Sequence, residues 1–151
     1  MSSSLIEFRV PYNASDQSIP PRPTLKDLRS LTPLQGHLTF VHVANLFHLF
    51  DYSQQAAAAK SLASLLSPEP GSTIFGTHRT ELNLGSYSNF RGELIHCHTP
   101  ETWTRLWDGE VFQKGTVRVI TEMKVFDAKD LAGLGLGIDK LHIMVWSVTR
   151  L

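Results

Sequence analysis

The sequence predicts a mixed α/β domain with the order strand, helix, strand, helix and two closing antiparallel strands. An apolar run at 38–43 precedes a helical pattern with one apolar face, and a second apolar run follows at 72–76. The segments 116–126 and 140–149 are rich in strand-forming residues, and the first alternates apolar with polar side chains. A strand, a helix and a strand with short connections form a βαβ unit, whose crossover we expect to be right-handed.

The chain divides into two parts. Residues 1–37 are predicted to be a proline-rich, irregular N-terminal segment, because proline removes a backbone donor and favours extended backbone before it. Within it, Thr24 is able to cap a short helix over 25–31. Residues 38–151 are predicted to form the α/β domain.

The first strand and the first helix of this domain have clear boundaries in the sequence. The run at 38–43 is too apolar for a half-exposed strand, so we expect it to be covered on both faces, as in a parallel sheet. Either Asp51 or Ser53 is placed to cap the helix that follows, and the prolines and glycine of 67–71 end it.

The next segment, 77–98, is polar and contains glycine, and it is predicted to be a long loop. A second helix begins at Thr99-Pro100-Glu101, which has a capping hydroxyl, a proline in the first helical position and an acid in the first turn. Trp103 and Trp107 lie on one face of that helix, and we expect both in the core.

Composition excludes several classes of protein. The chain has 151 residues, and its 14 Lys and Arg balance its 14 Asp and Glu. A net charge of zero argues against a nucleic-acid partner and against attraction to anionic membranes, and the 42% hydrophobic content argues against disorder. The single cysteine, Cys97, permits no intrachain disulfide, and the start lacks the pattern of a signal peptide, so we expect a cytoplasmic protein.

Several segments together resemble the fungal small-molecule methyltransferases, of the secondary-metabolite type, within the class I S-adenosylmethionine-dependent family. They are Leu31-Thr32-Pro33-Leu34-Gln35-Gly36, the run 41–50, the run 65–76, His98-Thr99-Pro100-Glu101-Thr102-Trp103 with Leu106-Trp107, and the ending 145–151. This resemblance implies the C-terminal half of a Rossmann-like methyltransferase sheet, a βαβ unit plus a closing antiparallel hairpin, in a three-layer α/β/α arrangement. It implies S-adenosylmethionine as the cofactor and transfer of a methyl group to an oxygen or nitrogen of a small metabolite.

The resemblance also implies where the cofactor would lie. Open α/β sheets bind ligands at the carboxyl edge of their strands, and there Val43, Ala44 and Asn45 are expected to contact the methionine end of the cofactor. For Asn45 the alternative is a residue that turns the chain.

Two histidines near this edge are candidates for chemistry. His48 is a candidate general base because its ordinary pKa is near neutral. The alternative, which applies even more to His42, is a histidine packed among aromatic side chains. His78 and Arg91, both in the predicted loop, are expected to bind the substrate, and the planar fork of Arg91 suits a carboxylate, although a solvated arginine is the commoner outcome.

A metal site is not expected. His96 and His98 flank Cys97, and His78 lies upstream, but no second cysteine or suitably spaced carboxylate completes a zinc set. Cys97 is therefore expected to be a small apolar core residue.

The sequence also departs from the family it resembles. Members begin with a strand that leads into a glycine-rich turn against the cofactor, and no segment here matches it. The glycines of 133–137 precede a strand, so they are expected to form a hairpin connection. We therefore expect a truncated methyltransferase. The alternatives are a non-catalytic remnant, or an interaction module that forms a homodimer through the exposed edge of the strand at 38–43.

Overall fold

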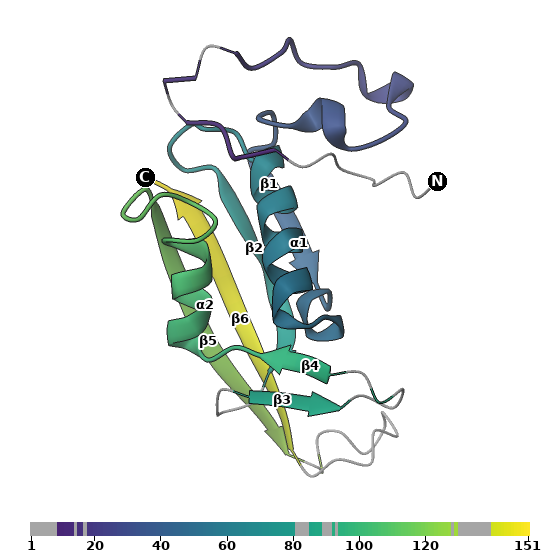
Figure 1. The fold of residues 1–151 in the computed structure, drawn as a ribbon, viewed down its shortest axis with the longest axis vertical. Helices are drawn as coiled ribbons and strands as arrows, with labels where there is room; N and C mark the ends of the chain where they lie inside the picture. Colours follow the sequence, from purple (N-terminus) through teal and green to yellow (C-terminus); the bar gives the residue numbers. More distant parts are fainter. Residues whose placement is uncertain are drawn as a thin grey trace.

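The computed structural model describes residues 9–13, 15–16, 18–80, 85–88, 92, 94–127, 129 and 140–151. Figure 1 shows the strands and helices in chain order, which are β1 (Phe40–Ala44), α1 (Tyr52–Leu65), β2 (Thr73–Thr80), β3 (Gly85–Ser88), β4 (Leu94–Cys97), α2 (Pro100–Trp107), β5 (Val117–Asp127) and β6 (Lys140–Arg150). Short 3₁₀ turns, η1 (Leu25–Asp27), η2 (Thr32–Leu34) and η3 (Phe47–Leu49), precede and follow β1.

Four of these strands form one sheet, in the order β1-β2-β6-β5 (Figure 1). β1 and β2 are parallel with α1 between them in the chain, as the βαβ prediction requires, and β6 runs antiparallel to both β2 and β5. β3 and β4 form a separate antiparallel pair. The mixed α/β prediction and the closing antiparallel hairpin are therefore confirmed.

Both helices begin where local chemistry predicts. At the start of α1, the Asp51 side chain accepts a hydrogen bond from the Gln54 N–H, and the Gln54 side chain accepts one from the Asp51 N–H. Thr99 and Thr102 form the same reciprocal box at the start of α2, with Pro100 in the first helical position. The first backbone N–H groups of a helix have no preceding turn whose carbonyls could accept from them, and the side chains of these boxes accept those hydrogen bonds. Among the described residues, no helix is long and apolar enough to span a membrane.

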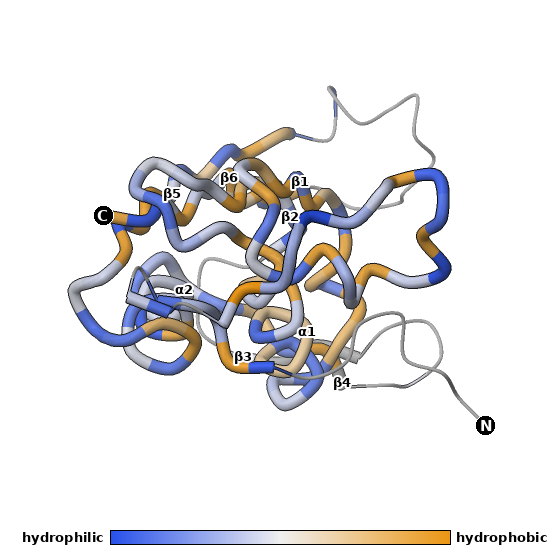
Figure 2. The backbone as a smooth tube through the Cα atoms, turned by 90° about the horizontal axis from the view of Figure 1, so that it is seen from above, coloured by the Kyte–Doolittle hydropathy of each residue, from blue (hydrophilic) through white to orange (hydrophobic). Residues whose placement is uncertain are grey.

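The core lies between the sheet and the two helices. Figure 2 shows α1 and α2 on the same side of the sheet. Trp103, Leu106 and Trp107 of α2 are fully buried there, as expected, and they pack with Phe47, Ala59, Ala63 and the inward side chains of the strands. Cys97 is 3% exposed in the core, which confirms the prediction for this residue.

The opposite face of the sheet carries no helix from the described part of the chain. Phe40 of β1 is 68% exposed on that face, whereas its neighbour Val41 is buried against the helices. The expectation that the strand at 38–43 is covered on both faces was wrong, and so was the three-layer arrangement for the described residues. An apolar run indicates that its side chains favour burial, but it does not indicate which segment, of this chain or another, packs over them.

Two local predictions are also corrected. The segment 77–98 is not one loop, because β2 continues to Thr80 and the β3–β4 pair follows. Polar residues form strands here because a ladder is held by backbone groups, whatever the side chains. The helix expected over 25–31 is only the turn η1, whose preceding residue Thr24 makes no side-chain capping bond. Strand β6 is central in the sheet, between β2 and β5.

Candidate functional site

The carboxyl ends of the two parallel strands, β1 and β2, form the candidate site. β1 and β2 run in register from the pair Phe40–Thr73 to the pair Ala44–Thr77, so both strands end at one edge of the sheet. Open α/β sheets bind their ligands at the carboxyl ends of the parallel strands. The turn after β1, with η3, and the last residues of β2 therefore supply the side chains of this edge.

Asn45 makes the sharp turn at the end of β1. Its φ angle is +54°, in the left-handed region, and its N–H donates to the Thr77 carbonyl at 2.8 Å. Asparagine tolerates this backbone conformation better than most residues. The expected role of Asn45 in turning the chain is therefore present, and its exposed side chain remains available for a ligand.

The two residues before Asn45 face opposite ways. Val43 is buried on the helix side, whereas Ala44 is exposed on the open face. Opposite Val43 lies Gly76 of β2, where a Cβ would meet the Val43 carbonyl oxygen at 1.7 Å. A side chain at position 76 would therefore push the two strands apart, a requirement for glycine that the sequence analysis missed.

His48 lies on η3, directly after the turn, and is half-buried. Burial lowers the pKa of His48, and the positive charge of Arg79 adds to that effect. The imidazole is therefore neutral at pH 7, the form that accepts a proton. Arg79 was expected only as one polar residue of a loop, but the structure places it on β2 beside this histidine.

His78 has a different position from the one expected, because it lies on β2 in the core, only 3% exposed. Its Nδ1 accepts a hydrogen bond from the Trp146 indole N–H at 3.0 Å, and its ring is 4.6 Å from that of Trp103. Burial lowers its pKa to about 3, with contributions from the charges of His98 and His48. This location suits a residue that positions the edge, and substrate contact by His78 stays a prediction.

His96 and His98 lie beside this core, with ring centroids 4.6 Å apart. The Nδ1 of His98 pairs with the Thr102 hydroxyl at 3.0 Å, and burial lowers the pKa of His98 to about 3. In the described part of the chain, no three His, Cys, Asp or Glu side chains come together in a way that would hold a metal ion. Arg91 and the glycines of 133–137 lie outside the described residues.

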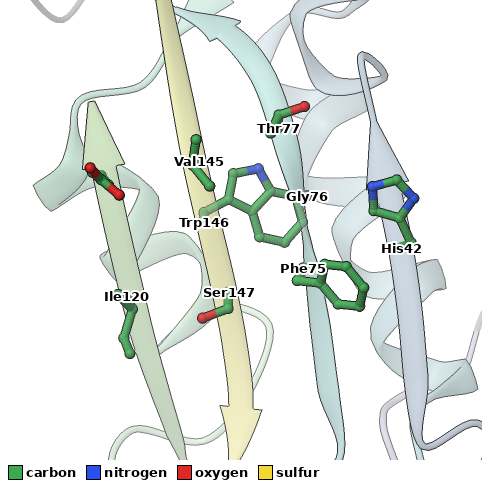
Figure 3. Close-up of a pocket in the computed structure, with 9 residues that line it drawn as sticks. His42, Phe75, Gly76, Thr77, Ile120, Val145, Trp146 and Ser147 are labelled. Carbon is green, nitrogen blue, oxygen red and sulfur yellow. The ribbon is translucent and has the colours of Figure 1, made fainter. Parts of the chain in front are cut away.

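A depression of about 310 Å³ lies on the open face of the sheet (Figure 3). Phe75 stacks on His42, with centroids 5.1 Å apart, and Figure 3 shows Phe75 between His42 and the β6 residues Trp146 and Ser147. The depression is lined by His42, Phe75, Gly76, Thr77, Ile120, Glu122, Val145, Trp146 and Ser147. Most of it lies along the middle of the strands, and at Thr77 it reaches the carboxyl edge of β1 and β2.

Comparison with known proteins shows what this fold and edge are similar to. The chain is 32% identical to the O-methyltransferase phiE of a fungal species over 111 residues, which are 72% of this chain and 37% of that protein. The resemblance to fungal small-molecule methyltransferases is confirmed. The methyltransferase-like chain is also 32% identical over 84 residues to the asnovolin E/chermesin D methyltransferase nvfJ of Aspergillus novofumigatus, covering 51% of this chain and 28% of that protein.

A third relative extends the same pattern. The methyltransferase-like chain is 31% identical to the methyltransferase adrK of Penicillium roqueforti over 80 residues, which are 52% of this chain and 28% of that protein. No protein-family model matches the sequence. The matches thus cover between 28% and 37% of the relatives' own lengths.

Proposed function

We propose that this chain is a class I methyltransferase-like protein, dependent on S-adenosylmethionine, that acts on a small-molecule metabolite. The observation that carries the proposal is the carboxyl edge of β1 and β2, where Asn45 makes the turn after β1 and His48 lies near Arg79. The names of the matched fungal relatives support methyl transfer as the reaction class.

The strand arrangement supports a methyltransferase origin. A parallel pair joined by a helix, followed by a helix and an antiparallel hairpin, is the order that the resemblance implies for the second half of that fold. The central position of β6, between β2 and β5, makes the closing hairpin part of the same sheet. We therefore assign the described residues to the C-terminal half of a Rossmann-like sheet.

The described residues fit only one end of the implied cofactor. Ala44 and Asn45 present exposed groups at the strand ends, whereas the Val43 side chain faces the core, so any contact from Val43 would be through its backbone. Among the described residues, no glycine-rich turn leads from a strand into a helix, and no carboxylate lies at the end of β1 to hold ribose hydroxyls. These residues alone do not make a complete cofactor site.

Within the proposal, the chain's own residues bind and orient the acceptor. S-adenosylmethionine would supply the methyl group. The neutral imidazole of His48 would accept the proton of an acceptor hydroxyl, and the Asn45 amide would hold an oxygen of the ligand. Arg79 beside His48 would favour an acceptor that carries negative charge, a role that Arg91 would share from outside the described residues.

The incomplete cofactor site favours a second candidate. In this alternative the chain is a non-catalytic relative, a truncated remnant that binds no cofactor by itself. For either candidate we also propose a cytoplasmic location, because a chain with a single cysteine forms no intrachain disulfide and so needs no oxidising compartment.

Calorimetric titration with S-adenosylhomocysteine separates the two candidates. The methyltransferase proposal expects saturable binding in the micromolar range, and Asn45→Gly should weaken it by about tenfold because one hydrogen bond is lost. Asn13→Gly, at an exposed asparagine of the N-terminal segment, is the matched control and should bind like the parent. An absence of heat at millimolar ligand contradicts the enzyme and supports the remnant.

A further inference from the structure

The open face of the sheet has an apolar centre. Phe40, Phe75 and Ile120 are 68%, 40% and 58% exposed on it, and Phe75 and Ile120 line the depression shown in Figure 3. Contiguous exposed apolar side chains of this kind mark surfaces that associate with another protein. The surface is here named the open face and consists of the outward side chains of β1, β2, β6 and β5.

The strand register arranges the open face in rows. One row contains Phe40, Thr73, Thr149 and Arg118, and the next contains His42, Phe75, Ser147 and Ile120. Each row therefore runs from an aromatic or histidine ring on β1 to Arg118 or Ile120 on β5. Large and small side chains alternate across the middle of the second row, from Phe75 to Ser147.

We propose that the open face binds the open face of a second copy of this chain, forming a two-fold symmetric dimer. A two-fold axis that runs along the strands keeps each row level and reverses the strand order. β1 of one copy then lies over β5 of the other, and β2 lies over β6, an aligned packing that suits two sheets.

Shape supports this occupant. The axis places the Phe75 ring of each copy opposite Ser147 of the other, where the small Ser147 side chain lines the depression of about 310 Å³. A large side chain thus meets a hollow twice in one interface, as a self-complementary surface requires. His42 would at the same time lie opposite Ile120 of the other copy.

Charge supports it as well. The same axis places Arg118 of one copy against the exposed Phe40 ring of the other, a cation–π arrangement that occurs twice. Glu122 already pairs with Lys124 on the same strand, so neither brings an unpaired charge to the interface. An axis across the strands would instead bring Arg118 against Lys124 of the other copy and is therefore disfavoured.

The available area sets the expected affinity. Four strands about 4.8 Å apart, with about seven residues per strand on average, offer a flat contact of roughly 450 Å² before side-chain relief is counted. Such a contact lies at the low end of specific interfaces, so we expect a micromolar dimer. The outer edge of β1, by comparison, offers the backbone of a five-residue strand only, so the open face provides the larger surface for self-association.

Sedimentation velocity of the full chain tests the proposal, with protein from about 1 to about 100 µM. The wild type should shift from the mass of one chain to that of two over this range. Ile120→Glu should remain a single chain throughout, because it buries a charge in the interface. Arg118→Ala should raise the dissociation constant about three- to tenfold. Leu25→Glu, at a residue 63% exposed on η1, is the matched control and should dimerise like the wild type.

Each other outcome overturns the proposal. If the wild type stays a single chain at the highest concentration, the open face does not bind a second copy and is left for a different protein. An Ile120→Glu variant that still dimerises places the contact elsewhere, at the β1 edge for example, since Ile120 lies on β5 at the other side of the sheet. Equal loss of dimer in Leu25→Glu, or open-ended aggregates in place of a pair, also contradicts it. Far-UV circular dichroism of each variant verifies that the fold is intact.

Discussion

The indole N–H of Trp146, on β6, donates a hydrogen bond to Nδ1 of His78, on β2, across 3.0 Å of the core. The two residues are 68 positions apart in the chain. The bond defines the state of the histidine, because an Nδ1 that accepts a proton donor carries no proton itself. A neutral imidazole protonated at Nε2 is thus built into the wall of the candidate site.

Trp146→Phe should destabilise the protein more than the loss of ring size alone. The substitution leaves Nδ1 of His78 buried without its donor, which adds about 1–3 kcal/mol to the free energy lost. Trp107→Phe is the matched control, because Trp107 is equally buried and its indole nitrogen has no hydrogen-bond partner among the described residues. Urea unfolding measures both variants, and equal losses would show that the bond contributes little.

Stability should fall on acidification between about pH 6.5 and pH 3. Burial lowers the pKa of His78 and of His98 to about 3, from 6.5 in the unfolded chain. The unfolded chain therefore takes up protons in this window that the folded chain does not, so their contribution is complete above pH 6.5 and lost below. The slope of the free energy of unfolding against pH should approach roughly 2.7 kcal/mol per pH unit for the two histidines together.

Urea midpoints measured across this window test the pH dependence. His98→Gln should reduce the slope by about 1.4 kcal/mol per pH unit, because one of the two titrating groups is gone. Leu25→Gln, at a residue 63% exposed on η1 that carries no titrating group, is the control and should leave the slope unchanged. A slope that His98→Gln does not alter would assign the acid sensitivity to other groups.

Gly76→Ala should destabilise the fold by at least about 3 kcal/mol, because the new methyl group overlaps the backbone of β1. The clash is with the Val43 carbonyl, which cannot move unless the parallel pair separates. Gly85→Ala on β3 is the control, since a Cβ there meets nothing within 4 Å. Thermal unfolding compares the two variants, and similar melting temperatures would contradict the close approach.

At the turn after β1, Asn45→Ala should lower stability by about 1–2 kcal/mol, and Asn45→Gly should be close to neutral. The φ angle of +54° is strained for alanine but open to glycine. Chemical denaturation of both variants measures this difference. Because Asn45→Gly keeps the backbone, its effect on binding of S-adenosylhomocysteine reports on the amide side chain alone. Equal stability of the alanine and glycine variants would contradict a left-handed turn at this residue.

Local sequence patterns predicted the elements that depend on interactions between neighbouring residues. The capping residues, Asp51 or Ser53 for the first helix and Thr99 for the second, predicted both helix starts, and the residues at 116–126 and 140–149 predicted β5 and β6. These signals each span only a few consecutive residues: a capping side chain, a proline in the first helical turn, or an alternating strand. A single sequence is therefore enough to recognise them. The resemblance to fungal methyltransferases was likewise legible from short motifs.

Tertiary structure alone decided which face of each strand is covered and which side chains meet. The sequence placed His78 in a loop beside a substrate, whereas strand pairing puts it in the core against Trp146. The apolar run at 38–43 gave no sign that Phe40 would face outward, because hydrophobicity has no direction. Contacts between distant residues depend on the register of whole strands, which forms only when the sheet assembles. For that reason neither the Trp146–His78 bond nor the open face could be derived from the sequence.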